Sequence, residues 1–396
     1  MGSETEVFTA NNLEFSWARS VSDISTDDWS RCFAAHRFAR SYAYQEAVEA
    51  SAPSGVEFHY LLISKSDSIV AMVGCFRYRI PLSTTATGSA RKAMGFCEGF
   101  FPELFSINGF FVGQLTAVCD HLFGFEQIPT PERASLLRLC EPAFLAKARS
   151  LGSSVILHKE IPQEDMEWAQ EALGEDYVVA PSLPAMELKL ESTEPFPKQL
   201  RKKYRNHYNR RRKQSDERGL TYEIHRGVLD KEVADEMEHL YFQVLERSAT
   251  QFERLSGDFF ISLLERCSQA SVVLCRDENK LVGFMVNVEA EQDFHGLYLG
   301  YDTAYRDAAV YFNLIYQSLD LALEKGYQSV HLGQTSYEVK SALGAHRTNL
   351  YLALRSKNPL IQFFLKTFSQ HLFPEIDVPV RRAFPVGGKR ETEPSP

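Results

Sequence analysis

The sequence lacks the features that mark membrane-spanning and secreted proteins. No uncharged apolar run approaches the roughly 18 residues that a membrane-spanning helix needs. The first residues, MGSETEVFTANN, have neither the basic start nor the apolar stretch of a signal peptide. Hydrophobic residues make up 44% of the chain and charged residues 24%, values typical of soluble globular proteins. We therefore expect a soluble, cytoplasmic protein without a transmembrane segment.

The chain also lacks the cysteine patterns of disulfide-rich proteins and of zinc sites. Its seven cysteines are odd in number, widely scattered and never spaced as CxxC: Cys32, Cys75, Cys97, Cys119, Cys140, Cys267 and Cys275. This distribution favours reduced thiols in a cytoplasm over a disulfide framework. No other spacing of ligand-type side chains predicts a metal site, so we expect none.

The chain contains two similar halves. Its 396 residues exceed what one hydrophobic core usually serves, so two domains are expected. The segment LLISKSDSIVAMVGC, from Leu61 to Cys75, has the pattern of two apolar strands around a polar turn. VLCRDENKLVGFMVN, from Val273 to Asn287, repeats it. Both segments predict β-hairpins.

The similarity continues downstream of the two hairpins. A helical pattern ends at Gly152 and is followed by a β-branched strand that carries His158. A second helical pattern ends at Gly326 and is followed by a strand that carries His331. Glycine is common just beyond a helix end. The order of elements therefore indicates a duplicated α/β unit.

The second half predicts a mixed sheet covered by helices. We expect strands at Leu220 to His225, Phe294 to Tyr301, Ser329 to Leu332 and Asn349 to Arg355, a hairpin at Ser271 to Glu289, and helices at Lys231 to Arg247, Asp258 to Gln269 and Tyr311 to Lys325. The predicted fold is α/β, with an α+β mixed sheet in each of two tandem domains. The expected divisions are 1–195, a connector at 196–219, 220–372, and a C-terminal segment with a disordered tail at 373–396.

The connector is a basic segment in an acidic chain. From Lys198 to Arg218 there are ten Lys and Arg residues against two acidic ones, while the whole chain has a formal net charge of -9. A helix here places Leu200, Tyr204, Tyr208 and Arg212 on one face. The cations, among them Arg210, Arg211 and Arg212, then form a solvated surface, a docking site for a phosphate or carrier protein, or a tRNA contact.

Two segments of the second half carry a family resemblance. FHGLYLGYD and YFNLIYQSLDLALEKGYQSVHLGQTSYEVKSALGA resemble the GNAT superfamily of acyltransferases, and the basic connector and DWSRCFAAHRFARSYAYQEAVEAS are similar to its FemAB-like branch, in which two GNAT-type folds share one chain. The resemblance covers roughly Phe15 to Lys366. One departure is YDTAYRDAAVYFNL, which stands where many acetyl-CoA-binding members have a glycine-rich loop. Here a helix N-terminus and Arg306 remain as expected phosphate contacts.

The resemblance implies amide formation. A primary amine, on a small molecule or a peptide, attacks a thioester of acyl-CoA or acyl-carrier protein, with no permanently bound cofactor. One alternative is an aminoacyl-tRNA-dependent transferase that acts on a peptide or cell-wall precursor. Another is a non-catalytic protein that binds a ligand or a carrier.

The segment HLGQTSYEVK follows the wedge in which the family places its donor, and its polar side chains are the expected site. We expect Glu338 or His331 as the base, Tyr337 as the proton donor and Lys340 as a contact for a carboxylate or phosphate. Gln334 and Tyr298 are expected donor or substrate contacts. The alternative interpretation is a hydrogen-bonded sheet histidine with surface charges around it.

Three further features are candidates for a role at the site. Asp302 orients the acceptor amine or is an ordinary turn residue, and backbone N–H groups near Leu299 and Gly300 form an oxyanion site. The phenylalanines of GFCEGFFPELFSINGFF line an acyl pocket, rest on a membrane surface or fill an inter-domain core: Phe96, Phe100, Phe101, Phe105, Phe110 and Phe111. We expect the first copy, which carries His158, to be mainly structural.

Overall fold

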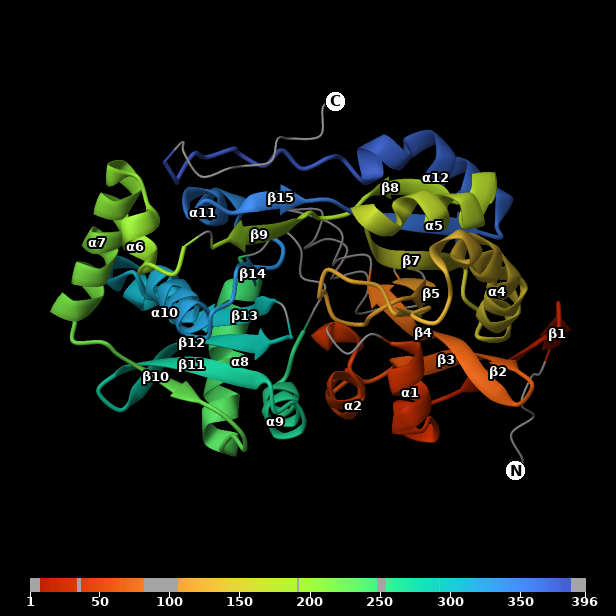
Figure 1. The fold of residues 1–396 in the computed structure, drawn as a ribbon, viewed down its shortest axis with the longest axis horizontal. Coiled ribbons are helices and arrows are strands. Elements are labelled where there is room, and N and C mark those ends of the chain that lie inside the picture. Colours follow the sequence, from red (N-terminus) through yellow and green to blue (C-terminus); the bar gives the residue numbers. More distant parts are fainter. Residues whose placement is uncertain are drawn as a thin grey trace.

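The chain folds into two lobes, each built on one mixed β-sheet (Figure 1). This computed structural model describes residues 8–33, 37–81, 106–190, 192–247, 254–291 and 293–385. The expected tandem α/β architecture is confirmed. None of the helices in these ranges combines the length and the apolar character needed to span a bilayer.

The first lobe is formed mainly by the first half of the chain. Its strands are β1 (Phe8–Ala10), β2 (Leu13–Ala18), β3 (Glu57–Lys65), β4 (Ser68–Pro81), β5 (Ser106–Val112), β6 (Phe123–Gly124), β7 (Val155–Pro162) and β8 (Val178–Pro181), and its helices are α1 (Thr26–Cys32), α2 (Tyr42–Ala50), α4 (Thr130–Ser150) and α5 (Met166–Leu173). Helices α4 and α5 bury one face of the sheet, while α1 packs on the other. Ser66 and Asp67 both have positive φ in the β3–β4 turn, as a two-residue hairpin turn requires.

The second lobe repeats this plan. Its strands are β9 (Ala185–Lys189), β10 (Thr221–His225), β11 (Ala270–Asp277), β12 (Lys280–Glu289), β13 (Phe294–Tyr301), β14 (Ser329–His331) and β15 (His346–Thr348), and its helices are α6 (Phe196–Gln199), α7 (Lys202–Glu217), α8 (Lys231–Leu245), α9 (Gly257–Arg266), α10 (Val310–Glu324) and α11 (Tyr337–Ala342). Strand β12 is buried almost throughout because α8 and α9 cover one face of the sheet and α10 covers the other.

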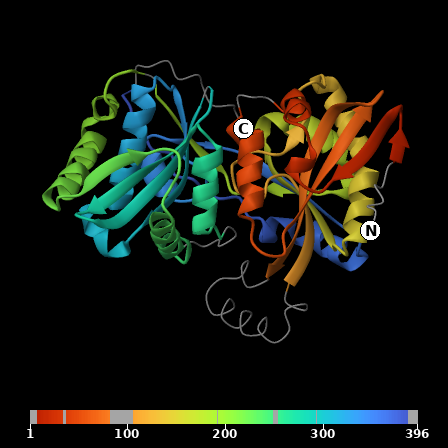
Figure 2. The ribbon, with the colours of Figure 1, turned by 90° about the horizontal axis from the view of Figure 1, so that it is seen from below.

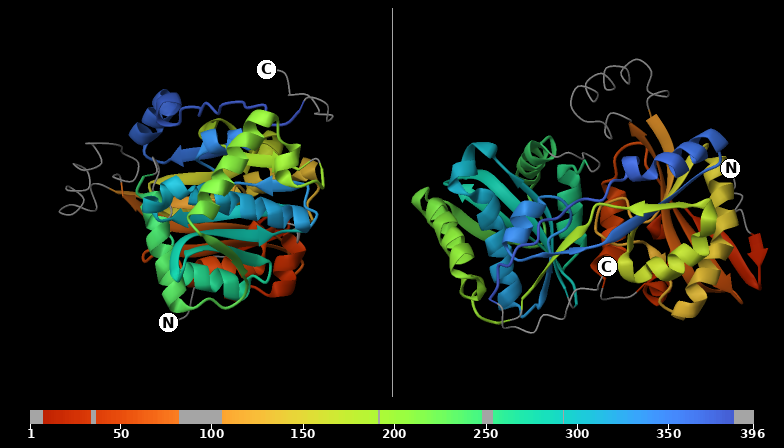
Figure 3. Two further views of the ribbon diagram at one scale, coloured as in Figure 1. Left: turned by 90° about the vertical axis from the view of Figure 1, so that its left-hand side faces the viewer. Right: turned by 90° about the horizontal axis from the view of Figure 1, so that it is seen from above.

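The two lobes exchange strands. Strand β9 precedes the expected boundary at residue 195, yet it pairs with β14 and β15 of the second sheet. Strand β16 (Leu350–Ser356) lies in the second half, yet it pairs with β7 and β8 of the first sheet. Helix α12 (Pro359–Leu372) follows it and packs on the first lobe (Figures 1 and 3). Neither sheet is therefore completed by its own half of the chain.

A shared apolar core also joins the lobes. Tyr44 and Ala47 of α2 belong to the same buried cluster as Phe260 and Leu263 of α9. Arg266 and Glu46 form an ion pair of 3.8 Å beside this contact. The two helices lie at the junction of the lobes in Figures 1 and 2. The lobes are thus held together by strand pairing and by helix packing.

Cutting the chain at the boundary expected from sequence tests this exchange. Residues 1–195 alone lack β16, so β8 loses the one strand that pairs with it in the described part of the chain, and β7 loses one neighbour. We expect this fragment to show no cooperative thermal transition by circular dichroism, and mixing it with residues 196–396 to restore one. An isolated 1–195 fragment that unfolds cooperatively, like the intact chain, would contradict the exchange.

Candidate functional site

Strands β13 and β14 diverge after two paired residues. Their parallel pairing is confined to Phe294 with Val330 and His295 with His331. Beyond this point β13 stays on β12, and a register shift next to Asn287 marks a bulge in that pairing. The chain after β14 instead stays with β9, where the N–H of Leu332 donates to the carbonyl of Met186. A V-shaped opening results between the two strands.

Backbone N–H groups of β13 point into this opening. The N–H of Asp302 donates to the carbonyl of Val282 on β12 at 2.9 Å. Successive N–H groups of a strand point to opposite edges, so those of Gly300 and Tyr298 also point toward β12. The N–H groups of Leu299 and Tyr301 point to the other edge, on the side of β14. They are placed as donors for a ligand in the V.

A cavity of about 680 Å³ lies at the opening and is bounded by both lobes. The second lobe contributes residues of β13, β14 and the segment after β14, among them Leu297, Leu299, His331, Gln334 and Lys340. The first lobe contributes Arg37, Phe111, Asp120, Lys159 and Glu160. The site is therefore assembled from both copies of the unit.

Two histidines and an aspartate meet at the closed end of the V. The rings of His295 and His331 stack with centroids 4.5 Å apart and planes 8° apart. His331 Nε2 lies 3.6 Å from Asp293 Oδ1, which is longer than an ordinary hydrogen bond. Contact with His331 nevertheless lowers the pKa of Asp293. Burial lowers the pKa of His295 to about 3, so His295 is neutral near pH 7.

Lys340 is a buried amine without a carboxylate partner among the described residues. Its Nζ donates to the carbonyl oxygens of Gln334 at 2.5 Å and Gly333 at 3.2 Å, and 6% of the residue is exposed. Burial lowers the pKa of Lys340 to about 7. Two of the three N–H bonds of the ammonium donate to these carbonyls. The third position on the nitrogen carries the proton that Lys340 can give to a group in the cavity or take from it.

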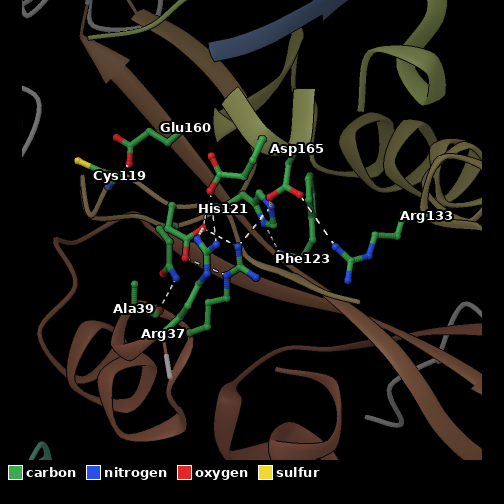
Figure 4. Close-up of polar contacts among 12 residues, drawn as sticks. Arg37, Ala39, Cys119, His121, Phe123, Arg133, Glu160 and Asp165 are labelled. Carbon is green, nitrogen blue, oxygen red and sulfur yellow. Dashed lines mark hydrogen bonds and ion pairs between the residues drawn. The ribbon is translucent and has the colours of Figure 1, made fainter. Parts of the chain in front are cut away.

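The first-lobe wall of the cavity is a buried polar network (Figure 4). Arg40 binds Asp120 through two hydrogen bonds of 2.9 and 2.5 Å. Figure 4 shows Glu160 turned toward Cys119, whose N–H donates to Glu160 Oε2 at 2.8 Å. Burial raises the pKa of Glu160, and the side chain of Gln334 faces it from the second lobe. A carboxylate of raised pKa thus lies within the cavity wall.

Strained backbone surrounds the same cavity. Cys119, Glu160, Thr335 and Ser336 all have φ between 52° and 64°, and all four line the cavity. This left-handed region is unfavourable for residues other than glycine and is common at functional sites. The packing of the surrounding structure therefore offsets the free energy that this backbone conformation costs.

The corresponding opening of the first copy is filled. Lys159 donates to the carbonyls of Gln114, Leu115 and Thr116, which holds the chain after β5 on β7. His158, the counterpart of His331, is fully buried, and neither of its ring nitrogens has a hydrogen-bond partner among the described residues. Burial lowers its pKa to about 3. His158 is a neutral core residue, and the open V belongs to the second copy.

Comparisons with known proteins agree with this duplicated architecture. Residues 202–341 match the family model "Acetyltransferase (GNAT) domain". The structure of FemX superposes with a TM-score of 0.53 and 10% identity, covering 86% of this chain and 98% of that one. A tandem GNAT protein from the clavulanic acid biosynthesis pathway superposes with a TM-score of 0.52 and 12% identity, covering 88% of this chain and 99% of that one. No curated protein matches the sequence.

The chain has the tandem GNAT fold. Its second copy is the one that matches the GNAT family model, and the V between β13 and β14 lies in that copy. The match begins at the first residue of α7, so the matched range includes the basic helix. The helix docks through buried Tyr208. Leu200 is also buried, but it lies before the first residue of α7 in extended backbone, so the expected helical face does not include it.

Four residues expected at the GNAT site from sequence line the cavity. They are His331, Gln334, Lys340 and Tyr298. Tyr337 and Glu338 do not line it. The hydroxyl of Tyr337 donates to the carbonyl of Pro184, and Glu338 forms an exposed ion pair with Arg381 at 2.7 Å. Side chains two residues apart on a helix point in nearly opposite directions, about 200° apart around the axis. Because the side chain of Lys340 on α11 is buried, that of Glu338 points to solvent.

Asp302 and the expected arginines lie outside the cavity. Asp302 accepts from the N–H of Ala304 and pairs with Lys280 at 2.8 Å, as a turn residue does. Arg306 and Arg210 are exposed, Arg212 is partly exposed, and the guanidinium of Arg211 lies 3.1 Å from the ring centre of Phe312. Phe110 and Phe111 are core residues of β5, and Phe111 also lines the cavity. Phe96, Phe100, Phe101 and Phe105 lie outside the described residues.

Sequence reasoning missed Asp293, His295 and Glu160. A signal for the first two was present, because residues two apart on a strand share a face, and DFH places Asp293 and His295 on the face that His331 reaches by register. Glu160 lies at a register irregularity between β7 and β16, which no periodicity in the sequence reveals.

Three amides of the turn before α10 are occupied within the protein. The N–H of Thr303 donates to Gln243, that of Ala304 to the Asp302 side chain, and that of Tyr305 to the Asp302 carbonyl. These three donors are therefore not free for a phosphate, and the turn lacks the glycines of a glycine-rich phosphate loop.

The pKa of Lys340 gives a test of the buried amine. The unfolded chain holds this proton up to an ordinary pKa of 10.5, and the folded chain releases it near pH 7. Between these values the unfolded state binds more protons, so this residue makes stability rise with pH. Below pH 7 both states are protonated and its contribution is constant.

We expect the unfolding free energy of the wild type, minus that of Lys340→Met, to increase by about 1 kcal/mol per pH unit from pH 7.5 to 9.5. Urea unfolding at several pH values measures this difference, with Lys366→Met on exposed α12 as the control. A difference that is independent of pH would contradict an amine buried in the folded chain.

Proposed function

We propose that the protein transfers an acyl group from an activated donor to a primary amine in the cavity between its lobes. The observation that carries this proposal is the open V of the second GNAT copy, with donor amides on one side and His331 and Lys340 on the other. The first copy lacks such an opening, because its own chain fills it. One working site thus serves the duplicated fold.

The donor lies along the free edge of β13. Its carbonyl oxygen accepts the N–H of Leu299 or Tyr301, and these donors stabilise the oxyanion of the tetrahedral intermediate. Leu297 and Leu299 provide apolar contacts for the acyl chain on the same strand. The acceptor amine enters from the first lobe, where Glu160 is a carboxylate for its ammonium group.

The proton steps use two groups of the second lobe. His331, held beside Asp293, takes a proton from the acceptor ammonium, and the resulting amine attacks the acyl carbon. When the intermediate collapses, the carbon–sulfur bond of the donor breaks, and Lys340 gives a proton to the departing thiolate. The neutral Lys340 then takes the second proton from the former amine nitrogen, which leaves a neutral amide. With a pKa of about 7, Lys340 both holds and releases this proton near neutral pH.

A thioester of CoA or of an acyl-carrier protein is the proposed donor, and the aminoacyl ester of a charged tRNA is the second candidate. The occupied amides of residues 303–305 favour a donor that does not need a glycine-rich pyrophosphate loop. Helix α7 adds the exposed cations Lys202, Lys203 and Arg210 on the outside of the same lobe. These cations suit an acidic carrier protein or a tRNA backbone.

Substitution of the proton-transfer residues tests the proposed chemistry. With a thioester that the wild type consumes, we expect His331→Gln and Lys340→Met each to lower kcat by about a hundredfold or more, since removal of a general acid or base typically costs this much. His371→Gln and Lys366→Met on α12 are matched controls and retain activity. Folded variants with unchanged kcat would contradict these roles.

The donor class is tested by comparing thioesters with charged tRNA. We expect thioester consumption in the presence of an amine library and none with charged tRNA alone. If tRNA is the donor instead, its affinity falls steeply with salt, and replacing Lys202, Lys203 and Arg210 by Gln reduces the slope of log K against log salt by about 2. Binding of either donor without any turnover would contradict catalysis and indicate a binding protein.

A further inference from the structure

Three ligand-type side chains converge at the closed end of the V. One atom each of Asp293, His295 and His331 lies within 4.8 Å of the other two. Asp293 and His295 lie at the start of β13 and His331 lies at the end of β14, where His295 and His331 are paired in register. All three line the cavity. We propose that Asp293, His295 and His331 bind a divalent transition-metal ion such as Zn²⁺.

The hydrogen-bond pattern of these side chains favours a set of metal ligands over residues that only stabilise the fold. Apart from the long 3.6 Å contact between His331 and Asp293, none of these side chains makes a hydrogen bond within the described part of the chain. The side chains of His331 and Asp293 are partly exposed to the cavity, at 30% and 38%, and so their lone pairs are accessible to a ligand there. Lone pairs of three ligand-type side chains that converge on one point can hold a cation.

The chemistry of the donors indicates the class of ion. Imidazole nitrogen and carboxylate oxygen suit Zn²⁺ and neighbouring first-row divalent ions, whereas Ca²⁺ and Mg²⁺ prefer sets of oxygen atoms. Three protein ligands leave at least one coordination position open, and this position faces the cavity.

The surroundings hold the ligands in place. The ring of Phe38 packs against His295 with centroids 4.5 Å apart, and His331 stacks on the other ligand ring. Glu187 lies opposite His331 in the β14–β9 pairing and adds negative charge, although its own carboxylate is bound to Ser329 and His346. Phe38 belongs to the first lobe, so the site is buttressed by both lobes.

Metal binding has a consequence for the acyl transfer, and this consequence rests on the proposed function. A lone pair of His331 that is bound to a metal cannot accept a proton from the acceptor. Occupation of the site and acyl transfer therefore exclude each other. The ion acts as an inhibitor that competes with the amine, and not as a participant in catalysis.

The experiment is a calorimetric titration of the full-length protein with Zn²⁺ alone. We expect one ion per chain, with affinity lowered about tenfold or more in each of Asp293→Asn, His295→Gln and His331→Gln. His371→Gln on the exposed face of α12 is the matched control, with unchanged affinity. Thermal melts establish that the variants are folded, and the half-exposed Asp293 is the position least sensitive to substitution.

Co²⁺ provides a measurement that needs no variant. Bound Co²⁺ gives visible absorption bands of a low-coordinate site, without the intense charge-transfer band of a cysteine thiolate, because the proposed ligands hold no sulfur. A wild type that binds neither ion, or folded variants that bind Zn²⁺ as tightly as the wild type, overturns the metal site.

These outcomes separate the metal site from the proposed function. The titration contains no donor or acceptor, so a protein without acyltransferase activity still tests the site. Where activity is present, added Zn²⁺ is expected to raise the KM for the amine in the wild type. Full activity at saturating Zn²⁺ supports the site but overturns the exclusion between metal binding and transfer.

Discussion

The site depends on the early separation of β14 from β13. Only two residues of each strand pair. Strand β14 is then held away from β13 by β9, which precedes the expected domain boundary in sequence but belongs to the second sheet. Because β9 fixes the position of β14, the V does not close by further pairing. Backbone donors along β13 are left facing a cavity, and buried donors of this kind require partners. In the proposed function, a bound acyl donor is the partner of these groups.

The same fold shows what happens when the opening is not preserved. In the first lobe, β5 pairs with β7 over four residues, and the chain then crosses the position of the V. Lys159 fixes this segment through three backbone carbonyls. The first copy thereby supplies a wall, carrying Arg37, Asp120 and Glu160, to the site of the second. Duplication has produced one shared cavity and not two equivalent sites.

The elements were largely predictable from sequence, while their partners were not. The predicted strand at Phe294 to Tyr301 has the bounds of β13, and the helix at Tyr311 to Lys325 differs from α10 by one residue at each end. Apolar periodicity reports which face of an element is buried, but it does not report which sheet the element joins. The exchange of β9 and β16 therefore had no signature in the sequence.

The site was predictable only where it follows a strand directly. His331, Gln334 and Lys340 reach the cavity because they lie at and just after the end of β14. Glu338 is as close in sequence, but its direction is set by the short helix α11, whose opposite face is buried. Glu160 belongs to the other half of the chain, and only the tertiary structure brings it near Gln334.

The central claim is that the V of the second copy holds the acyl donor. A crystal structure of the protein with a stable analogue of a consumed acyl thioester tests this most directly. We predict that the acyl carbonyl oxygen lies within hydrogen-bond distance of the N–H of Leu299 or Tyr301, with the thioether carbon chain between β13 and β14. An analogue bound elsewhere, with these N–H groups unchanged, would contradict the account.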